Sequence, residues 1–121
     1  MNSAEFRKEL VKIMPGYNWT VHKSTNPTSL SATGIKSSGF NRLSTLVVYR
    51  REDANEFERY EVKSAGFGTR ARWAHTTSDR TLARALRDLQ NHYEMKANTY
   101  RGLASQLQTG RVPSSQEGPA Q

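Results

Sequence analysis

Apolar side chains recur at helical spacing near the start of the chain. Phe6, Leu10 and Ile13 fall at i, i+4 and i+7, which places them on one face of a helix. Asn2 precedes them, and asparagine is one of the residues that cap helix N-termini. The pattern predicts a helix over 3–14.

A second helical pattern near the C-terminus is much longer. Thr77 or Ser78 is a natural N-cap, and Gly110 lies just beyond the last apolar residue. A helix of about 30 residues is about 45 Å long, more than a small sheet covers. We therefore expect its end to project or to meet another chain. A coiled-coil homodimer is one alternative, and pairing of the helix end with the N-terminal helix is the other. The apolar residues alternate at spacings of four and three around one polar position, Lys96: Leu82, Leu86, Leu89, Tyr93, Tyr100, Leu103 and Leu107.

Between the helical segments, apolar and polar residues alternate with a period of two, which is typical of half-buried strands. The strongest strand covers 43–51, because residues 46–49 are β-branched, aliphatic or aromatic. Residues 57–64 alternate again. We expect these two strands to form an antiparallel hairpin.

Weaker strand patterns cover 17–23 and 28–36, and residues 66–76 are expected to be a loop with at most a short strand around 71–73. The predicted order is a helix, three or four antiparallel strands and a long helix packed on one face of the sheet. This is an α+β fold.

Composition fits one small globular domain. The 121 residues suffice for a single domain, which we place over 1–108, with a disordered Ser-, Gly-, Pro- and Gln-rich tail over 109–121. The absence of cysteine excludes disulfides, thiolate metal sites and a cysteine nucleophile. No apolar run approaches the roughly 18 residues of a membrane span, and the N-terminus lacks the pattern of a signal peptide. We therefore expect a cytoplasmic protein.

The charge suggests a polyanionic partner such as DNA, RNA or an acidic protein surface, and the alternative is a small basic protein whose charge serves solubility alone. The formal net charge is +7 and the pI is about 10.1, which is typical of proteins that bind nucleic acid. No Asp or Glu occurs in residues 11–51, and residues 62–78 are also free of acids. Such segregation favours a surface of one sign.

The alternation sorts the central hairpin into two faces. The apolar set, expected to face the helices, is Leu46, Val48, Tyr60 and Val62. The opposite set is Tyr49, Arg51, Arg59 and Lys63, which Thr20 and His22 can join from the first strand. Rings beside cations on an open sheet bind single-stranded nucleic acid, because bases stack while phosphates meet Lys and Arg. The alternative is a solvated face with cross-strand pairs, such as Arg51 against an acid.

The segment after the hairpin interleaves aromatic and basic residues. Gly66 and Gly68 flank Phe67, and the rings of Phe67 and Trp73 interleave with Arg70 and Arg72. This composition suits a ligand-binding loop. It shares Gly-Phe-Gly with the RNA-recognition sheet motif, but the residues that follow in that motif are absent. The alternative is a flexible loop with a core tryptophan.

The start of the long helix carries a third basic group. Arg80, Arg84 and Arg87 are spaced four and three apart and are expected to form one stripe. Near a helix N-terminus such a stripe suits a phosphate. The alternative is a solvated helix face with Asp88 as a local ion partner.

Catalysis finds little support in the sequence. His22, His75 and His92 lack metal-ligand spacing, and no nucleophile elbow, Walker motif or paired-carboxylate signature occurs. We expect no enzyme, no catalytic residue, no metal and no cofactor, while a metal-free nuclease-like site built from Arg and His stays open.

The leading hypothesis is a non-catalytic nucleic-acid-binding accessory protein. The helix–sheet–helix order is similar to that of double-stranded-RNA-binding domains, but Ser78-Asp79-Arg80-Thr81 replaces their lysine-rich helix start, so only topology is shared. The alternatives are a phage- or plasmid-encoded inhibitor or adaptor that binds a host protein, and a binder of small phosphorylated ligands. The expected nucleic-acid-binding residues are Tyr49, Arg51, Arg59, Lys63, Phe67, Arg70, Arg72, Trp73, Arg80 and Arg84.

Overall fold

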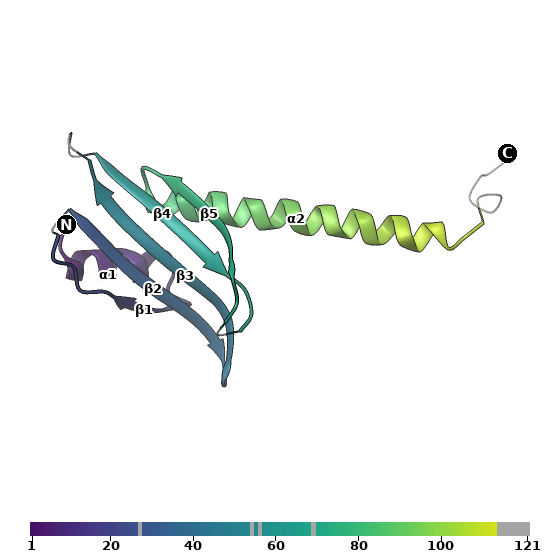
Figure 1. The fold of residues 1–121 in the computed structure, drawn as a ribbon, viewed down its shortest axis with the longest axis horizontal. Helices are drawn as coiled ribbons and strands as arrows, with labels where there is room; N and C mark the ends of the chain where they lie inside the picture. The colour runs from purple at the N-terminus through teal and green to yellow at the C-terminus, as the bar shows by residue number, and fades with distance from the viewer. Residues whose placement is uncertain (27, 54, 56, 69, 114–121) are drawn as a thin grey trace. The chain divides into compact units, whose positions relative to one another are not determined.

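The computed structural model describes residues 1–26, 28–53, 55, 57–68 and 70–113. The five strands pair antiparallel in the order β1-β2-β3-β4-β5, so each strand lies beside its neighbour in sequence, and the meander is seen in Figure 1. The expected α+β class is confirmed. The elements are α1 (Ser3–Ile13), β1 (Asn18–Val21), β2 (Ser29–Ser38), β3 (Asn41–Glu52), β4 (Glu58–Ala65), β5 (Trp73–Asp79) and α2 (Leu82–Gly110).

The chain divides into two compact units within α2. Met1–Leu89 contains α1, the sheet and the first turns of α2, and the second unit begins at Gln90. α2 continues through Thr109 and Gly110, where the sequence led us to expect the start of a disordered tail. Residues 114–121 of that tail lie outside the described residues. None of the helices in the described ranges is both long and apolar enough to cross a membrane.

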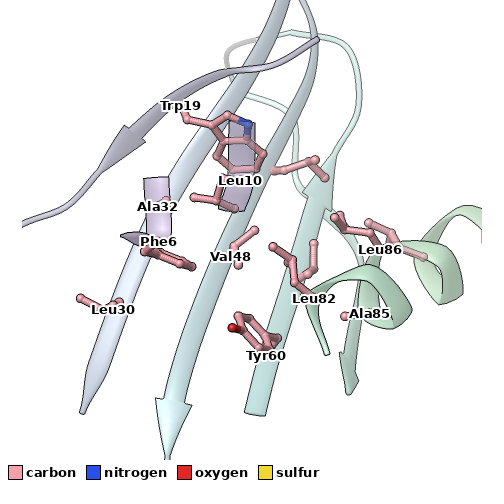
Figure 2. Close-up of a cluster of buried hydrophobic side chains, with 13 residues drawn as sticks. Phe6, Leu10, Trp19, Leu30, Ala32, Val48, Tyr60, Leu82, Ala85 and Leu86 are labelled. Carbon is pink, nitrogen blue, oxygen red and sulfur yellow. The ribbon is translucent and has the colours of Figure 1, made fainter. Parts of the chain in front are cut away.

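One face of the sheet forms the core with both helices. The expected inward set of the hairpin is confirmed, since Leu46, Val48, Tyr60 and Val62 are all buried. Figure 2 shows side chains of these strands in one cluster with side chains of both helices. α1 contributes Phe6 and Leu10, β1 and β2 contribute Trp19, Leu30 and Ala32, and α2 contributes Leu82, Ala85, Leu86 and Leu89.

Capping and side-chain hydrogen bonds fix α1 against β1. The Oδ1 of Asn2 accepts a hydrogen bond from the Glu5 amide at 2.8 Å, which confirms the expected N-cap. The Trp19 indole donates to the Met14 carbonyl at 3.0 Å, and an Arg7 Nη1 donates to the Trp19 carbonyl at 2.9 Å. These bonds satisfy the end of α1 and set where β1 begins.

The fifth strand lies in a segment for which the sequence indicated a loop and a helix cap. Thr77 and Asp79 pair with Val62 and Tyr60 of β4, so the expected N-cap at residue 77 or 78 is wrong. α2 starts only at Leu82, where the Thr81 hydroxyl accepts from the Arg84 amide at 3.2 Å. Residues 77–79 form a strand and not a helix cap, because pairing with β4 satisfies the hydrogen bonds of their backbone N–H and C=O groups.

Gly34 allows the Trp19 ring to lie flat on the sheet. The two residues are direct partners across β1 and β2, and a Cβ at residue 34 would lie 2.7 Å from the ring. We expect Gly34→Ala to lower the free energy of unfolding by about 1–3 kcal/mol, because the ring must shift within a packed core. Urea unfolding followed by far-UV circular dichroism measures this change.

Gly16→Ala is the matched control for that substitution. A Cβ at residue 16 meets nothing within 4 Å, so its effect should stay within about 0.5 kcal/mol. Equal unfolding midpoints for the two variants would contradict the close packing of Trp19 on Gly34.

Candidate nucleic-acid interface

The face of the sheet opposite the core cluster, called the open face below, presents the polar set expected from the sequence. Side chains alternate along a strand, so burial of Val48 and Tyr60 on one side directs their neighbours to the other. The open-face positions of β3 and β4 are Thr45, Val47, Tyr49, Arg51, Arg59, Glu61, Lys63 and Ala65. The four hairpin residues expected there from the sequence thus share one surface.

Tyr49 lies between two cations on the open face. The Arg51 guanidinium carbon lies 5.8 Å from the centre of the Tyr49 ring, and the Lys63 ammonium lies 5.4 Å from it. These are cation–π distances. The ring is half-buried, so Tyr49 orders the two cations and offers less free surface for stacking than a fully exposed ring.

Arg51 faces another cation across the hairpin. Its direct partner on β4 is Arg59, whose Nη2 donates to the Ser78 hydroxyl of β5 at 2.9 Å. Among the described residues, no carboxylate forms an ion pair with Arg51, Arg59 or Lys63. The acid on the open face of this hairpin is Glu61, which stands opposite Tyr49. The alternative in which Arg51 pairs with an acid across the hairpin is therefore wrong.

A hollow of about 250 Å³ opens at the other end of the open face. The connection between β4 and β5 forms one wall, and the Gly68 amide donates to the Arg42 carbonyl at 2.9 Å, which anchors that wall to the start of β3. Gly68 has a φ of 101°, a left-handed conformation that favours glycine. The lining residues are Thr33, Arg42, Thr45, Val47, Ala65, Gly68, Ala71 and Trp73.

The aromatic residues around the hollow are accessible to a ligand. Trp73 pairs with Ala65 across β4 and β5 and is 51% exposed. Phe67 is also exposed, as are Arg70 and Arg72. The alternative that Trp73 is a core tryptophan is wrong, since Trp19 fills that role with 4% exposure.

The basic stripe expected at the start of α2 does not form as a unit. Arg80 precedes α2, and its guanidinium carbon lies 5.0 Å from the centre of the Phe57 ring. Arg84 is exposed on α2, which covers the core face, so it lies on the opposite side of the sheet from Tyr49. The two residues therefore do not extend the open face as one surface.

The histidines and acids give no metal site. His22 Nε2 lies 2.7 Å from the Thr33 hydroxyl, which places His22 beside the open face of β2, as expected. In the described part of the chain, no group of three or more His, Asp or Glu side chains is arranged to hold a metal ion. The open face brings together cations, aromatic rings and a hollow.

A buried charge cluster centred on Arg50 was not predicted from the sequence. This side chain is only 1% exposed and donates to Glu52 at 2.9 Å and to Glu58 at 2.6 Å. Its Nε also donates to the Tyr60 hydroxyl at 3.2 Å. An arginine on the apolar side of a strand, with acids nearby on both hairpin strands, was the available signal.

Burial and hydrogen bonding act in opposite directions on the Arg50 pKa. Burial lowers it, and the hydrogen bonds to Glu52, Glu58 and Tyr60 raise it, with a net rise above the ordinary value. Burial is also the main cause that raises the pKa of Tyr60. The stability linked to the neutral phenol is therefore present below its unfolded pKa of about 10 and is lost as the pH rises through the higher folded value. The cluster stabilises the end of the core and takes no part in the open face.

The open face and its hollow form the strongest candidate site on the described surface. Three cations without a carboxylate partner among the described residues, an exposed tryptophan and a hollow lie on the face of the sheet opposite the core cluster. No protein-family model, curated protein or solved structure matches the chain.

Proposed function

We propose that the protein is a non-catalytic accessory protein that binds single-stranded nucleic acid across the open face of its sheet. The observation that carries this proposal is the direct opposition of Arg51 and Arg59, neither of which has a carboxylate partner among the residues that the structure describes. Like charges opposite one another destabilise a sheet, and an anion between them removes that cost. A nucleic-acid backbone supplies such anions in a row.

The basic side chains define a path for the phosphates. Arg59 and Lys63 are four residues apart on β4, which is about 13 Å along the strand. Arg51 stands beside the first of them, and the exposed Arg70 and Arg72 follow β4 in the connection to β5. The path suits a few consecutive phosphates, and it leads toward the hollow.

The hollow supplies a place for one unstacked base. Its volume of about 250 Å³ is below the roughly 300–1,000 Å³ of sites for drug-sized ligands, so it suits a single ring system and not a whole nucleotide. Trp73 offers a stacking surface, and Val47 and Ala65 line the site with apolar groups. Stacking on one aromatic ring contributes about 1–3 kcal/mol per base.

This geometry favours single strands over duplexes. A base reaches a hollow beside Trp73 only when it is unstacked and unpaired, which costs a duplex a few kcal/mol. Duplex readers place a helix or ribbon in a groove, whereas here the basic residues lie on a sheet whose helices cover the other face. Single-stranded DNA or RNA is therefore the proposed ligand.

Fluorescence anisotropy with labelled oligonucleotides of about 12 nucleotides tests the proposal. Single-stranded DNA, single-stranded RNA and the matching duplex are titrated at 50 and 200 mM salt after a high-salt nuclease wash of the protein. Phosphate contacts by Arg51, Arg59 and Lys63 give a slope of about −2 in log affinity against log salt for a single strand. Binding should therefore weaken about 20-fold between the two salt concentrations.

The outcomes separate the proposal from its rivals. Micromolar or tighter binding of single strands at 50 mM salt, with weaker duplex binding, supports it. No binding at 50 mM salt overturns it, and capture of one stoichiometric host protein would then favour the inhibitor or adaptor hypothesis. Binding of mononucleotides as strong as that of the oligonucleotides would favour a small phosphorylated ligand.

A further inference from the structure

The second unit of the chain carries an apolar stripe that nothing in the described residues covers. α2 continues from Gln90 to Gly110, about 31 Å at 1.5 Å per residue. Tyr100, Leu103 and Leu107 are 62%, 57% and 72% exposed along it. A free helix of this length is marginally stable in water, because most helical stability in proteins comes from packing of an apolar face. The stripe therefore calls for a covering surface.

The spacing of the stripe is that of a coiled-coil seam. Tyr93, Tyr100 and Leu107 occupy the first core position of successive heptads, and Lys96 and Leu103 occupy the second. The flanking positions on one side of the seam are Gln90, Ala97 and Ala104, and those on the other side are His92, Thr99 and Gln106. None of these flanking residues carries a carboxylate, Lys or Arg, so the seam borders are uncharged and partly small.

The charges on this helix distinguish the two possible orientations. In a parallel pair, Lys96 of each subunit would face Lys96 of the partner subunit inside the seam, which brings like charges together. In an antiparallel pair crossing at the level of residue 98, Lys96 faces the partner's Tyr100 and Tyr93 faces the partner's Leu103. The first contact is a cation–π pair, and the second is apolar.

A second charge pair fits the same antiparallel register. Glu94 and Arg101 are seven residues apart, so they lie on the same side of the helix, two turns apart. In the antiparallel pair, Glu94 lies beside Arg101 of the partner subunit, and the symmetry repeats the contact. Ala97 lies between them and faces the partner's Ala97, and its small side chain allows the helices to approach closely.

We propose that α2 beyond Leu89 pairs antiparallel with the same segment of a second copy of this chain, crossing at the level of residue 98. The interaction buries Tyr93, Tyr100 and Leu103 in both copies. The pairing does not depend on the proposed function and is measured without nucleic acid.

Sedimentation equilibrium of the full chain measures the association directly. A dimer has a mass of 27.4 kDa, twice the 13.7 kDa of one chain. We expect Glu94→Arg or Arg101→Glu alone to weaken dimerisation by about tenfold, because each turns two attractions into repulsions. The double variant Glu94→Arg, Arg101→Glu should restore it. A chain that stays monomeric at about 100 μM, or a double variant that remains as weak as the single ones, overturns the proposal.

Cross-linking through single introduced cysteines tests the orientation. The natural chain has no cysteine, so a short bismaleimide reacts only at the introduced residue. Ala97→Cys should give covalent dimers, while the control Asn98→Cys, which points away from the seam, should give few. Efficient cross-linking of Lys96→Cys but not of Ala97→Cys would show a parallel pair and overturn the antiparallel register.

Discussion

Arg50→Ala is expected to lower the free energy of unfolding by about 3 kcal/mol or more. Removal of one partner from a buried ion pair leaves the remaining charges and hydrogen-bonding groups without compensation, at a typical cost of 3–5 kcal/mol. Arg50 holds Glu52, Glu58 and the Tyr60 hydroxyl together. The two acids keep some contact with water, so the lower end of that range applies. Urea denaturation at neutral pH measures the change.

The neighbouring residue provides a control for this substitution. Arg51→Ala removes the same charge from the same strand, but its side chain is exposed on the open face. Its unfolding free energy should stay within about 0.5 kcal/mol of the wild-type value. If the Arg50 variant is as stable as the Arg51 variant, the hydrogen-bonded cluster does not stabilise the fold as described.

The double variant Arg51→Ala, Arg59→Ala is expected to weaken single-strand binding by on the order of tenfold to a hundredfold at 50 mM salt. Two of the three phosphate contacts are lost, so the slope of log affinity against log salt should fall from about −2 to about −0.7. The substitutions should lower the affinity without lowering the free energy of unfolding, because they remove two like charges that stand opposite one another. Anisotropy and urea unfolding on the same sample measure both quantities.

A control variant that loses the same formal charge on the other side of the sheet distinguishes loss of the site from loss of net charge. Arg84→Ala, Arg87→Ala also lowers the formal charge by two, but both residues are exposed on α2, which packs on the core face. Its affinity and salt slope should remain close to those of the wild-type protein. Equal losses in the two double variants would indicate attraction by overall charge without a defined site on the open face.

The sequence predicted the central hairpin well because its alternation agrees with its tertiary environment. The burial of Val48 and Tyr60 and the exposure of Arg51 and Arg59 follow from a period of two along β3 and β4. The helix α1 and its Asn2 cap were equally readable, because both are local features.

The features that the sequence did not predict depend on long-range contacts. β5 was not expected, because Thr77 and Asp79 resemble a helix cap locally and only their pairing with β4 makes them a strand. The hollow was also hidden, since it needs the β4–β5 connection to return to Arg42 at the start of β3. Once the register is known, the separation of Arg84 from the open face follows directly.

In the proposed complex, single-stranded nucleic acid lies on the open face with a base against Trp73. The chain has two tryptophans, of which Trp73 is half exposed in the hollow and Trp19 is buried in the core. Tryptophan emission therefore reports on the hollow, and the substitution Trp73→Phe keeps an aromatic ring while it removes that signal.

We would follow tryptophan emission and the anisotropy of the same labelled single strand in one titration at 50 mM salt. We expect tryptophan emission to be quenched with the same midpoint as the anisotropy change. We expect Trp73→Phe to bind still, with little change in the emission of the remaining Trp19. Binding by anisotropy with unchanged wild-type emission would rule out a base against Trp73, and no binding at all would rule out the proposed nucleic-acid site.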